Sequence, residues 1–284
     1  MVISMIKTLK GMIYRKISCM KWAMQKRQIK IQLDGNKDIA SEISESDKIV
    51  IISPHPDDEL ISCFNTILQF NKKCTIIYVG LTGYNPEDKK VRTNEFQLFC
   101  TAADVECIVL NDDWKAAILN VLLNTRFDAV FIPSCIDWHW EHREVCSVVT
   151  QALNNCNYSG KLFWYQVTVP IPAERITHFK KFDSIASKNK WQLFKKVYIS
   201  QNFMPLYRLK QTENRYLIKN KRCYAEVFWK IPIKEGKRIV NALIDMADFL
   251  DSGKSKINNL LQISEFSNFI SKELSIDENK NNRY

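Results

Sequence analysis

Two short clusters of polar residues carry the side chains that could perform chemistry. The first is Pro-His-Pro-Asp-Asp-Glu at 54–59, and the second is Asp-Trp-His-Trp-Glu-His at 137–142. Three of the four histidines in the chain lie in these clusters, and the fourth, His178, is isolated and is interpreted as a surface or core histidine. Histidines and carboxylates gathered in this way are typical of metal sites and of general acid–base catalysis.

One metal ion could be held by His55, Asp58 and His142, which offer two imidazoles and a carboxylate. Hydrolytic zinc sites combine such ligands with a water, and the metal lowers the pKa of that water to about 7. The same ligand set suits Fe²⁺ or another divalent ion. Asp57 and Asp58 are adjacent and point different ways, so one carboxylate could bind the metal while the other takes a proton from the water.

The second cluster also holds residues that could support the reaction. A protonated His139 could stabilise the oxyanion of a tetrahedral intermediate or protonate the leaving amine. Glu141 could fix the tautomer of a histidine. Trp138 and Trp140 flank His139 and could stack on a sugar ring, although at least one of them is expected to pack in the core.

Strands that alternate with helices must position these clusters. Short apolar strands are predicted at 48–52, 74–79, 106–110, 128–132 and 162–167, and helices at 59–70, 87–103, 115–123, 143–153 and 236–250. This pattern predicts a Rossmann-like three-layer α/β domain, with a mostly parallel central sheet and helices on both faces. Both clusters follow strands, where such a sheet forms its sites. The alternative is structural, because Asp57 or Asp58 could simply cap the helix that begins near Glu59.

Composition excludes several classes of protein. The chain has 284 residues, of which 46% are hydrophobic and 25% charged, as in globular proteins. It has seven glycines and no G-x-G, so a dinucleotide-binding fingerprint and a P-loop are both excluded. The nine cysteines are scattered without a C-x-x-C, which predicts reduced thiols and a cytoplasmic protein.

The net charge of +10 belongs mostly to an N-terminal arm. Eight basic residues precede the first acidic residue, Asp34, and the remainder of the chain is nearly neutral, so we expect no nucleic-acid partner. The arm predicts a basic amphipathic helix that could lie on an anionic membrane at its cytoplasmic face or pack on the domain. Its apolar stripe is Val2, Ile6, Leu9, Ile13, Ile17, Met20 and Met24.

These patterns divide the chain into three parts. Residues 1–46 are expected to form the arm and a polar linker, 47–270 the α/β domain, and 271–284 a polar tail. No apolar run approaches the roughly 20 residues that a transmembrane helix needs. Lys7 and Lys10 interrupt the apolar stretch that a signal peptide would require.

The sequence resembles the PIG-L / LmbE-like deacetylase family over about residues 47–170. The segment at 54–59 matches the signature of the family, and Leu81-Thr-Gly83 resembles its turn after the second strand. Arg92-Thr-Asn-Glu95 resembles its R-x-x-E helix, and His139-Trp-Glu-His142 its late H-x-x-H. Members are zinc-dependent N-deacetylases that act mostly on N-acetylglucosamine-type amides, so the resemblance implies this reaction.

The resemblance also implies roles for single residues. It assigns His55, Asp58 and His142 as zinc ligands, Asp57 as the general base, His139 and Glu141 as groups that assist catalysis, and Arg92 and Glu95 as residues that bind or support the substrate. The alternative for the last two is a solvated pair on a helix surface. The chain departs from the family at Ser62-Cys-Phe-Asn65, where glycines are common, and at Trp140 and Glu141, where Pro and Asp are usual.

Two functions follow from this sequence. The first is a metal-dependent hydrolase that removes the acetyl group from an N-acetylglucosamine-type amide, with a small-molecule or lipid-linked amino sugar as its partner. The alternative is a catalytically inactive member that binds a glycan or a partner at a membrane surface, and the departures from the family pattern are its only support. A two-metal phosphoesterase is disfavoured because such sites need more ligands than these clusters offer.

Overall fold

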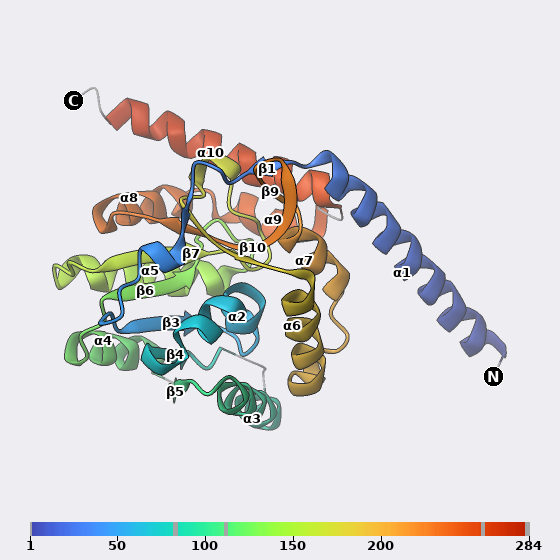
Figure 1. Cartoon of the computed structure of the whole chain (residues 1–284), viewed down its shortest axis with the longest axis horizontal. Coiled ribbons are helices and arrows are strands. Elements are labelled where there is room, and N and C mark those ends of the chain that lie inside the picture. The colour runs from blue at the N-terminus through green and yellow to red at the C-terminus, as the bar shows by residue number, and fades with distance from the viewer. Residues whose placement is uncertain (1, 82–84, 111–112, 257–258, 282–284) are drawn as a thin grey trace.

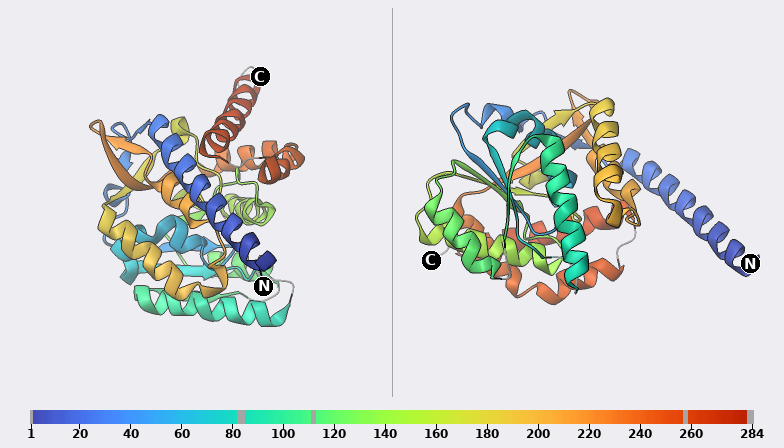
Figure 2. Two further views of the ribbon diagram at one scale, coloured as in Figure 1. Left: turned by 90° about the vertical axis from the view of Figure 1, so that its right-hand side faces the viewer. Right: turned by 90° about the horizontal axis from the view of Figure 1, so that it is seen from below.

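A mostly parallel β-sheet lies between layers of helices (Figures 1 and 2). This computed structural model describes residues 2–81, 85–110, 113–256 and 259–281. The predicted three-layer α/β fold is confirmed. The parallel strands lie in the order β5, β4, β3, β6, β7 and have the bounds Glu106–Val109, Cys74–Tyr78, Ile49–Ser53, Ala129–Pro133 and Lys161–Tyr165.

Successive residues of the central strands point to opposite faces of the sheet and build two cores. In β3, Val50 and Ile52 face one core, and Ile49 and Ile51 face the other. The helices that bury the first face are α4 Trp114–Asn124, α5 Trp140–Asn155 and α8 Ile233–Ile244. Those that bury the second are α2 Asp58–Phe70, α3 Pro86–Ala103 and α6 Ser184–Val197. A strand buried on both sides explains the unbroken apolar run in the sequence.

The last third of the chain adds strands that the periodicity did not predict. The long strand β10, Lys221–Lys230, runs antiparallel to β7 and continues the sheet. It also pairs antiparallel with two short strands, β8 His178–Phe182 and β9 Tyr216–Ile218. Helix α7, Leu206–Glu213, lies between β8 and β9 in the sequence.

The segment expected to be a linker is instead part of the folded body. Strand β1, Ile31–Gln32, pairs with β9, and β2, Lys37–Asp38, pairs with β8. Ile39 is fully buried against the core beside α2. The polar composition of this segment wrongly predicted a linker, because a few apolar residues between the polar ones are enough to hold the segment against the body.

Replacing Ile39 by alanine is therefore expected to lower the free energy of unfolding by about 2–5 kcal/mol, through lost burial and the cavity left behind. Ile185 is 67% exposed on α6, and the same substitution there should change stability by no more than about 0.5 kcal/mol. Urea unfolding followed by circular dichroism measures both. Equal stabilities for the two variants would show that residues 35–47 do not pack on the body.

The predicted polar tail is also mostly helix. Helix α8 ends at Ile244, where one longer helix was expected, and is followed by α9, Ala247–Lys256, and α10, Leu260–Asn281. Along α10, Ile263, Phe266, Ile270 and Leu274 are buried at helical spacing. Residues 271–275, the first part of the predicted tail, thus belong to an amphipathic helix whose inner face includes Leu274.

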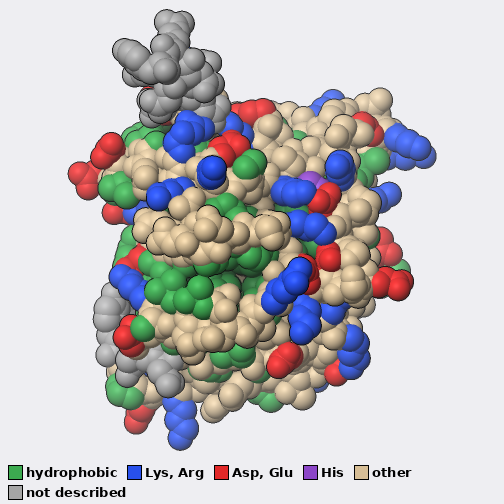
Figure 3. Space-filling view, turned by 90° about the vertical axis from the view of Figure 1, so that its left-hand side faces the viewer, with side chains coloured by type: hydrophobic (Ala, Val, Ile, Leu, Met, Phe, Trp, Pro, Cys, Tyr) green, Lys and Arg blue, Asp and Glu red, His purple; other side chains and the backbone are tan. Residues whose placement is uncertain are grey.

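The N-terminal arm forms helix α1, Val2–Gln28, which extends well beyond the body (Figures 1 and 2). Among the described residues no helix is long and apolar enough to cross a membrane. On the face of the body in Figure 3, Lys and Arg side chains are interspersed with Asp and Glu, in keeping with the nearly neutral body expected from the sequence.

Candidate metal centre

The two polar clusters meet because β3 and β6 are parallel neighbours in the sheet. Ile49 pairs with Ala129 and Ile51 with Phe131, so the two strands end at the same edge. The first cluster occupies the turn after β3 and the start of α2, with Asp58 as the first helical residue. The second leads into α5, which begins at Trp140, three residues earlier than predicted. Its first turn therefore carries Glu141 and His142.

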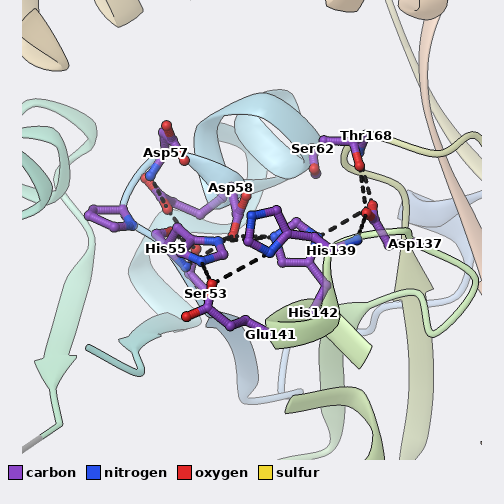
Figure 4. A network of polar contacts seen from close by, with 12 residues as sticks. Ser53, His55, Asp57, Asp58, Ser62, Asp137, His139, Glu141, His142 and Thr168 are labelled. Atoms are coloured by element: carbon purple, nitrogen blue, oxygen red, sulfur yellow. Dashed lines mark hydrogen bonds and ion pairs between the residues drawn. The ribbon is translucent and has the colours of Figure 1, made fainter. Parts of the chain in front are cut away.

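Three of the predicted ligand atoms form a nearly equilateral triangle. Asp58 Oδ2 lies 3.2 Å from His55 Nδ1 and 3.2 Å from His142 Nε2, and these two nitrogens are 3.1 Å apart (Figure 4). Tetrahedral ligands about 2.0–2.1 Å from a zinc ion are themselves roughly 3.3 Å apart. The triangle thus has the dimensions of three ligands around one metal ion.

The third ligand could also be a histidine. Ligand nitrogens of His55, His139 and His142 all lie within 4.8 Å of one another, so the three histidines form a second candidate set. His55 and His142 are common to both sets. We favour Asp58 over His139, because its carboxylate oxygen is close to both shared nitrogens and an anion offsets the charge of a divalent ion.

Neighbouring charges shift the pKa values of the two adjacent buried carboxylates in opposite directions. Burial alone would raise the pKa of Asp58, but His142 and His55 hold it well below its ordinary value. Burial and the charge of Asp58 raise the pKa of Asp57 well above its ordinary value. Burial alone would lower the pKa of His142, but Asp58 and Asp137 raise it to about 10. Two carboxylates with diverging pKa values are suited to different roles.

Asp57 occupies a strained turn rather than capping α2. Its φ of 134° is a conformation that side-chain-bearing residues rarely adopt, and its side chain makes no hydrogen bond to the helix amides. Arg92 instead holds it from α3: its Nη2 donates to Pro56 O at 2.8 Å and lies 3.3 Å from Asp57 Oδ2. The capping alternative for Asp57 is thus not supported.

Arg92 and Glu95 have separate contacts. Glu95 is buried and accepts hydrogen bonds from the backbone N–H and the hydroxyl of Ser200, at 2.8 and 2.6 Å. It therefore ties α3 to the loop after α6, while Arg92 faces Asp57. A solvated surface pair does not describe this geometry.

The remaining predicted residues divide between the site and the core. Glu141 Oε2 lies 2.7 Å from His55 Nε2 and 3.5 Å from His139 Nδ1, so it contacts both rings. Trp138 packs against Phe266 with ring centroids 6.2 Å apart, whereas Trp140 is 55% exposed. Thr82 and Gly83, from the turn that resembles the family pattern, lie outside the described residues.

Asp137 is a further candidate site residue, to which the sequence analysis assigned no role. Its Oδ2 contacts His142 Nδ1 at 3.3 Å, on the side of the ring away from Asp58. It also accepts hydrogen bonds from Thr168 Oγ1 at 2.5 Å and from the His139 backbone N–H at 2.9 Å (Figure 4). The signal was its place at the head of the second cluster. The carboxylate of Asp137 is thus placed as the outer carboxylates that orient the histidines of metal sites are.

Asp137→Asn is expected to weaken zinc binding by about 10–100-fold, because the amide removes the charge that orients His142 and raises its basicity. Competition with a chromogenic chelator measures this affinity. Asp104→Asn is the matched control, since Asp104 forms an exposed pair with Lys72 at the C-terminal end of α3, in another part of the chain. An unchanged zinc affinity in Asp137→Asn would refute the orienting role.

Glu59 stabilises the turn between β3 and α2. It is fully buried and accepts hydrogen bonds from Ser53 Oγ at 2.7 Å, from the Asp57 backbone N–H at 3.2 Å and from the Tyr198 hydroxyl. Burial raises the pKa of Glu59. These bonds fix the backbone between β3 and α2, on which the positions of Asp57 and Asp58 depend.

Comparison with known proteins identifies the fold. No protein-family model matches the sequence, and no curated protein matches it. Among solved structures, a deacetylase–teicoplanin complex from the teicoplanin biosynthesis pathway is 14% identical, covers 64% of this chain and 97% of that chain, and has a TM-score of 0.50.

Two further structures of this kind resemble the chain. The A40926 pseudoaglycone deacetylase Dbv21 is 16% identical, covers 66% of this chain and 97% of that chain, and has a TM-score of 0.49. The zinc-inhibited form of the teicoplanin deacetylase Orf2 is 14% identical, with coverages of 64% and 97% and a TM-score of 0.48. The chain shares the fold of the deacetylase in the teicoplanin complex, which is the fold that the resemblance to PIG-L / LmbE-like deacetylases implies.

Proposed function

We propose that this protein is a metal-dependent hydrolase of the PIG-L / LmbE-like type that removes the acetyl group from an N-acetylglucosamine-type amide. The observation that carries the proposal is the triangle of His55 Nδ1, Asp58 Oδ2 and His142 Nε2. The buried Asp57 precedes Asp58 in the chain. The fold shared with a deacetylase of the teicoplanin biosynthesis pathway supports the reaction class. We propose Zn²⁺ as the metal, and Fe²⁺ or another divalent ion also suits this donor set.

Asp57 is the proposed general base. Zn²⁺ bound by His55, Asp58 and His142 would polarise the amide carbonyl and lower the pKa of the attacking water. The Asp57 carboxylate takes a proton from this water while the water oxygen forms a bond to the carbonyl carbon of the amide. The C–N bond then breaks, and the same proton passes to the leaving nitrogen. The amine and acetic acid are released, and the acetic acid gives up the second proton of the water to become acetate. Arg92 keeps the carboxylate aimed at the reacting water.

His139 and Glu141 assist in this proposal. Burial and the charges of His142 and His55 lower the pKa of His139 to about 4, so we propose a neutral ring that donates a hydrogen bond to the oxyanion. This differs from the protonated ring considered from sequence. Glu141 contacts His55 and fixes its tautomer.

Trp140 is the proposed sugar-stacking residue. More than half of its surface is exposed beside His139, whereas Trp138 is held by Phe266 and serves packing. The substrate is a small or lipid-linked N-acetyl amino sugar. Two residues of α3 support the substrate site indirectly. Arg92 contacts Asp57, and Glu95 accepts a hydrogen bond from Ser200.

The departures from the family pattern do not favour the inactive alternative. Ser62 Oγ donates to Gln166 O at 2.6 Å. Asn65 donates from its backbone and its side chain to Glu226 Oε1, at 2.7 and 3.0 Å. Where the family has glycines, this chain thus has larger side chains whose polar groups are hydrogen-bonded. The triangle of candidate ligand atoms is present beside them.

The experiment is acetate release from a panel of N-acetyl amino sugar conjugates, with metal analysis of the same sample. We expect release from at least one conjugate by protein that holds one zinc ion per chain. Protein that holds zinc and releases no acetate from any conjugate would favour the glycan- or partner-binding alternative.

We also propose a cytoplasmic protein that contacts an anionic membrane through its N-terminal arm. All nine cysteines are free, as expected in a reducing compartment. Turnover of a soluble conjugate requires no such contact, so the two proposals are tested separately.

A further inference from the structure

Helix α1 has two apolar faces, and only one of them packs on the body. Trp22 is 3% exposed and lies in a small core with Leu260 and Ile263 of α10. Its ring makes an edge contact with Tyr207 of α7 at 6.2 Å. The Arg208 guanidinium lies 5.5 Å from the Trp22 ring. These contacts anchor the second half of the helix.

The predicted apolar stripe lies on the opposite face of the helix. Ile13, Ile17, Met20 and Met24 are each between 51% and 65% exposed. At about 100° per residue they fall within an arc of about 60°, on the side of the axis away from Trp22. Leu261 of α10 joins Ile17, Met20 and Met24 around a shallow apolar groove. In the sequence, Val2, Ile6 and Leu9 continue the same spacing.

Basic residues flank this stripe. Lys16 and Arg27 lie on one side of it by helical position, and Lys21 lies on the other and lines the groove. The chain has no acidic residue before Asp34. A second copy of the helix would bring like charges together, whereas phosphate headgroups would complement them.

We propose that the outer stripe of α1, formed by Ile13, Ile17, Met20 and Met24, lies in the surface of an anionic lipid bilayer while Trp22 holds the helix to the enzyme. An apolar stripe bordered by Lys and Arg is the pattern of helices that lie in the plane of a membrane interface. The two interpretations left open by the sequence, membrane contact and packing on the domain, thus apply together to opposite faces of one helix.

The anchor also connects the membrane to the metal centre. Trp138, between Asp137 and His139, packs against the core that Trp22 forms with α10. A helix bound to the bilayer would therefore hold the catalytic loop near the lipid surface, where a lipid-linked amino sugar would lie. This choice of substrate rests on the proposed function, whereas lipid binding is measured without turnover, so failure of either proposal can be distinguished.

The test is sedimentation of the full chain with phosphatidylcholine vesicles that contain about one quarter phosphatidylserine. The variant carries Ile17→Ser, Met20→Ser and Met24→Ser, which leave the charge unchanged. The control carries Leu98→Ser, Leu123→Ser and Ile244→Ser, three residues that are 60–65% exposed elsewhere on the surface. Circular dichroism verifies that all three proteins are folded.

We expect wild type and control to bind the vesicles equally. The affinity of the stripe variant should be lower by a factor of roughly ten or more. Binding of wild type should fall as NaCl is raised from about 0.1 M to about 1 M, because salt screens the headgroup charges. Equal binding by the stripe variant, no binding by wild type, or equal binding to vesicles of phosphatidylcholine alone would overturn the proposal. The proposal would also be overturned if wild type does not bind lipid but forms a dimer that the stripe substitutions abolish.

Discussion

Asp57→Asn is expected to lower kcat for acetate release by about 10²–10⁴-fold while the protein keeps one metal ion per chain, because the variant removes only the proton-accepting group. Asp57 lies outside the ligand triangle, so the metal should remain. Asparagine has the size of aspartate and tolerates a positive φ better than most residues, so the turn should keep its shape. The loss should therefore be catalytic rather than structural.

The matched control for this variant is Asp104→Asn. Asp104 also has a positive φ, of 53°, and ends α3 on the surface far in sequence from both clusters. Its substitution should leave kcat and metal content unchanged. If Asp57→Asn retained full turnover with one metal ion per chain, another group would have to accept the proton.

His55→Ala should lose bound zinc, and with it nearly all turnover. The substitution removes one of three ligand atoms, so the loss of affinity should exceed the roughly 10–100-fold typical of residues outside the ligand shell. Dialysis against a weak chelator followed by metal analysis measures the retained ion. His178→Ala is the control, because His178 is a buried histidine that contacts Glu42 and lies outside the cluster.

A third variant separates the two candidate ligand sets. His139→Ala should keep its zinc and lose turnover if Asp58 completes the site. Loss of zinc from His139→Ala, together with its retention in Asp58→Asn, would show that the three histidines bind the metal instead. Stoichiometric zinc in His55→Ala would exclude both sets.

The central fold could be predicted because its signals are local. The apolar run at 48–52 and the one at 128–132 each indicate a strand buried on both faces, and the intervening helical spacing implies parallel neighbours. Residues 35–47 were misjudged because their burial depends on partners more than a hundred residues away, such as β8. No local periodicity contains that information.

The same distinction holds at the metal centre. The candidate ligands and Asp57 could be singled out because they lie in two compact clusters after strands. Thr168 and Tyr198 could not, since each contributes a single polar group from a distant part of the chain to Asp137 or Glu59. Sequence spacing also could not decide which face of α1 packs on the body, because Trp22 lies off the predicted stripe.

The backbone at Asp57 implies a trade-off between stability and activity. A non-glycine residue at this φ costs about 1–3 kcal/mol, and the buried carboxylate adds to that cost. Glycine at 57 would relieve both costs, so an inactive Asp57→Gly protein should melt at a higher temperature than wild type. Selection for stability alone would thus favour glycine at position 57, and the strain retained there is what the proposed role of the Asp57 carboxylate requires.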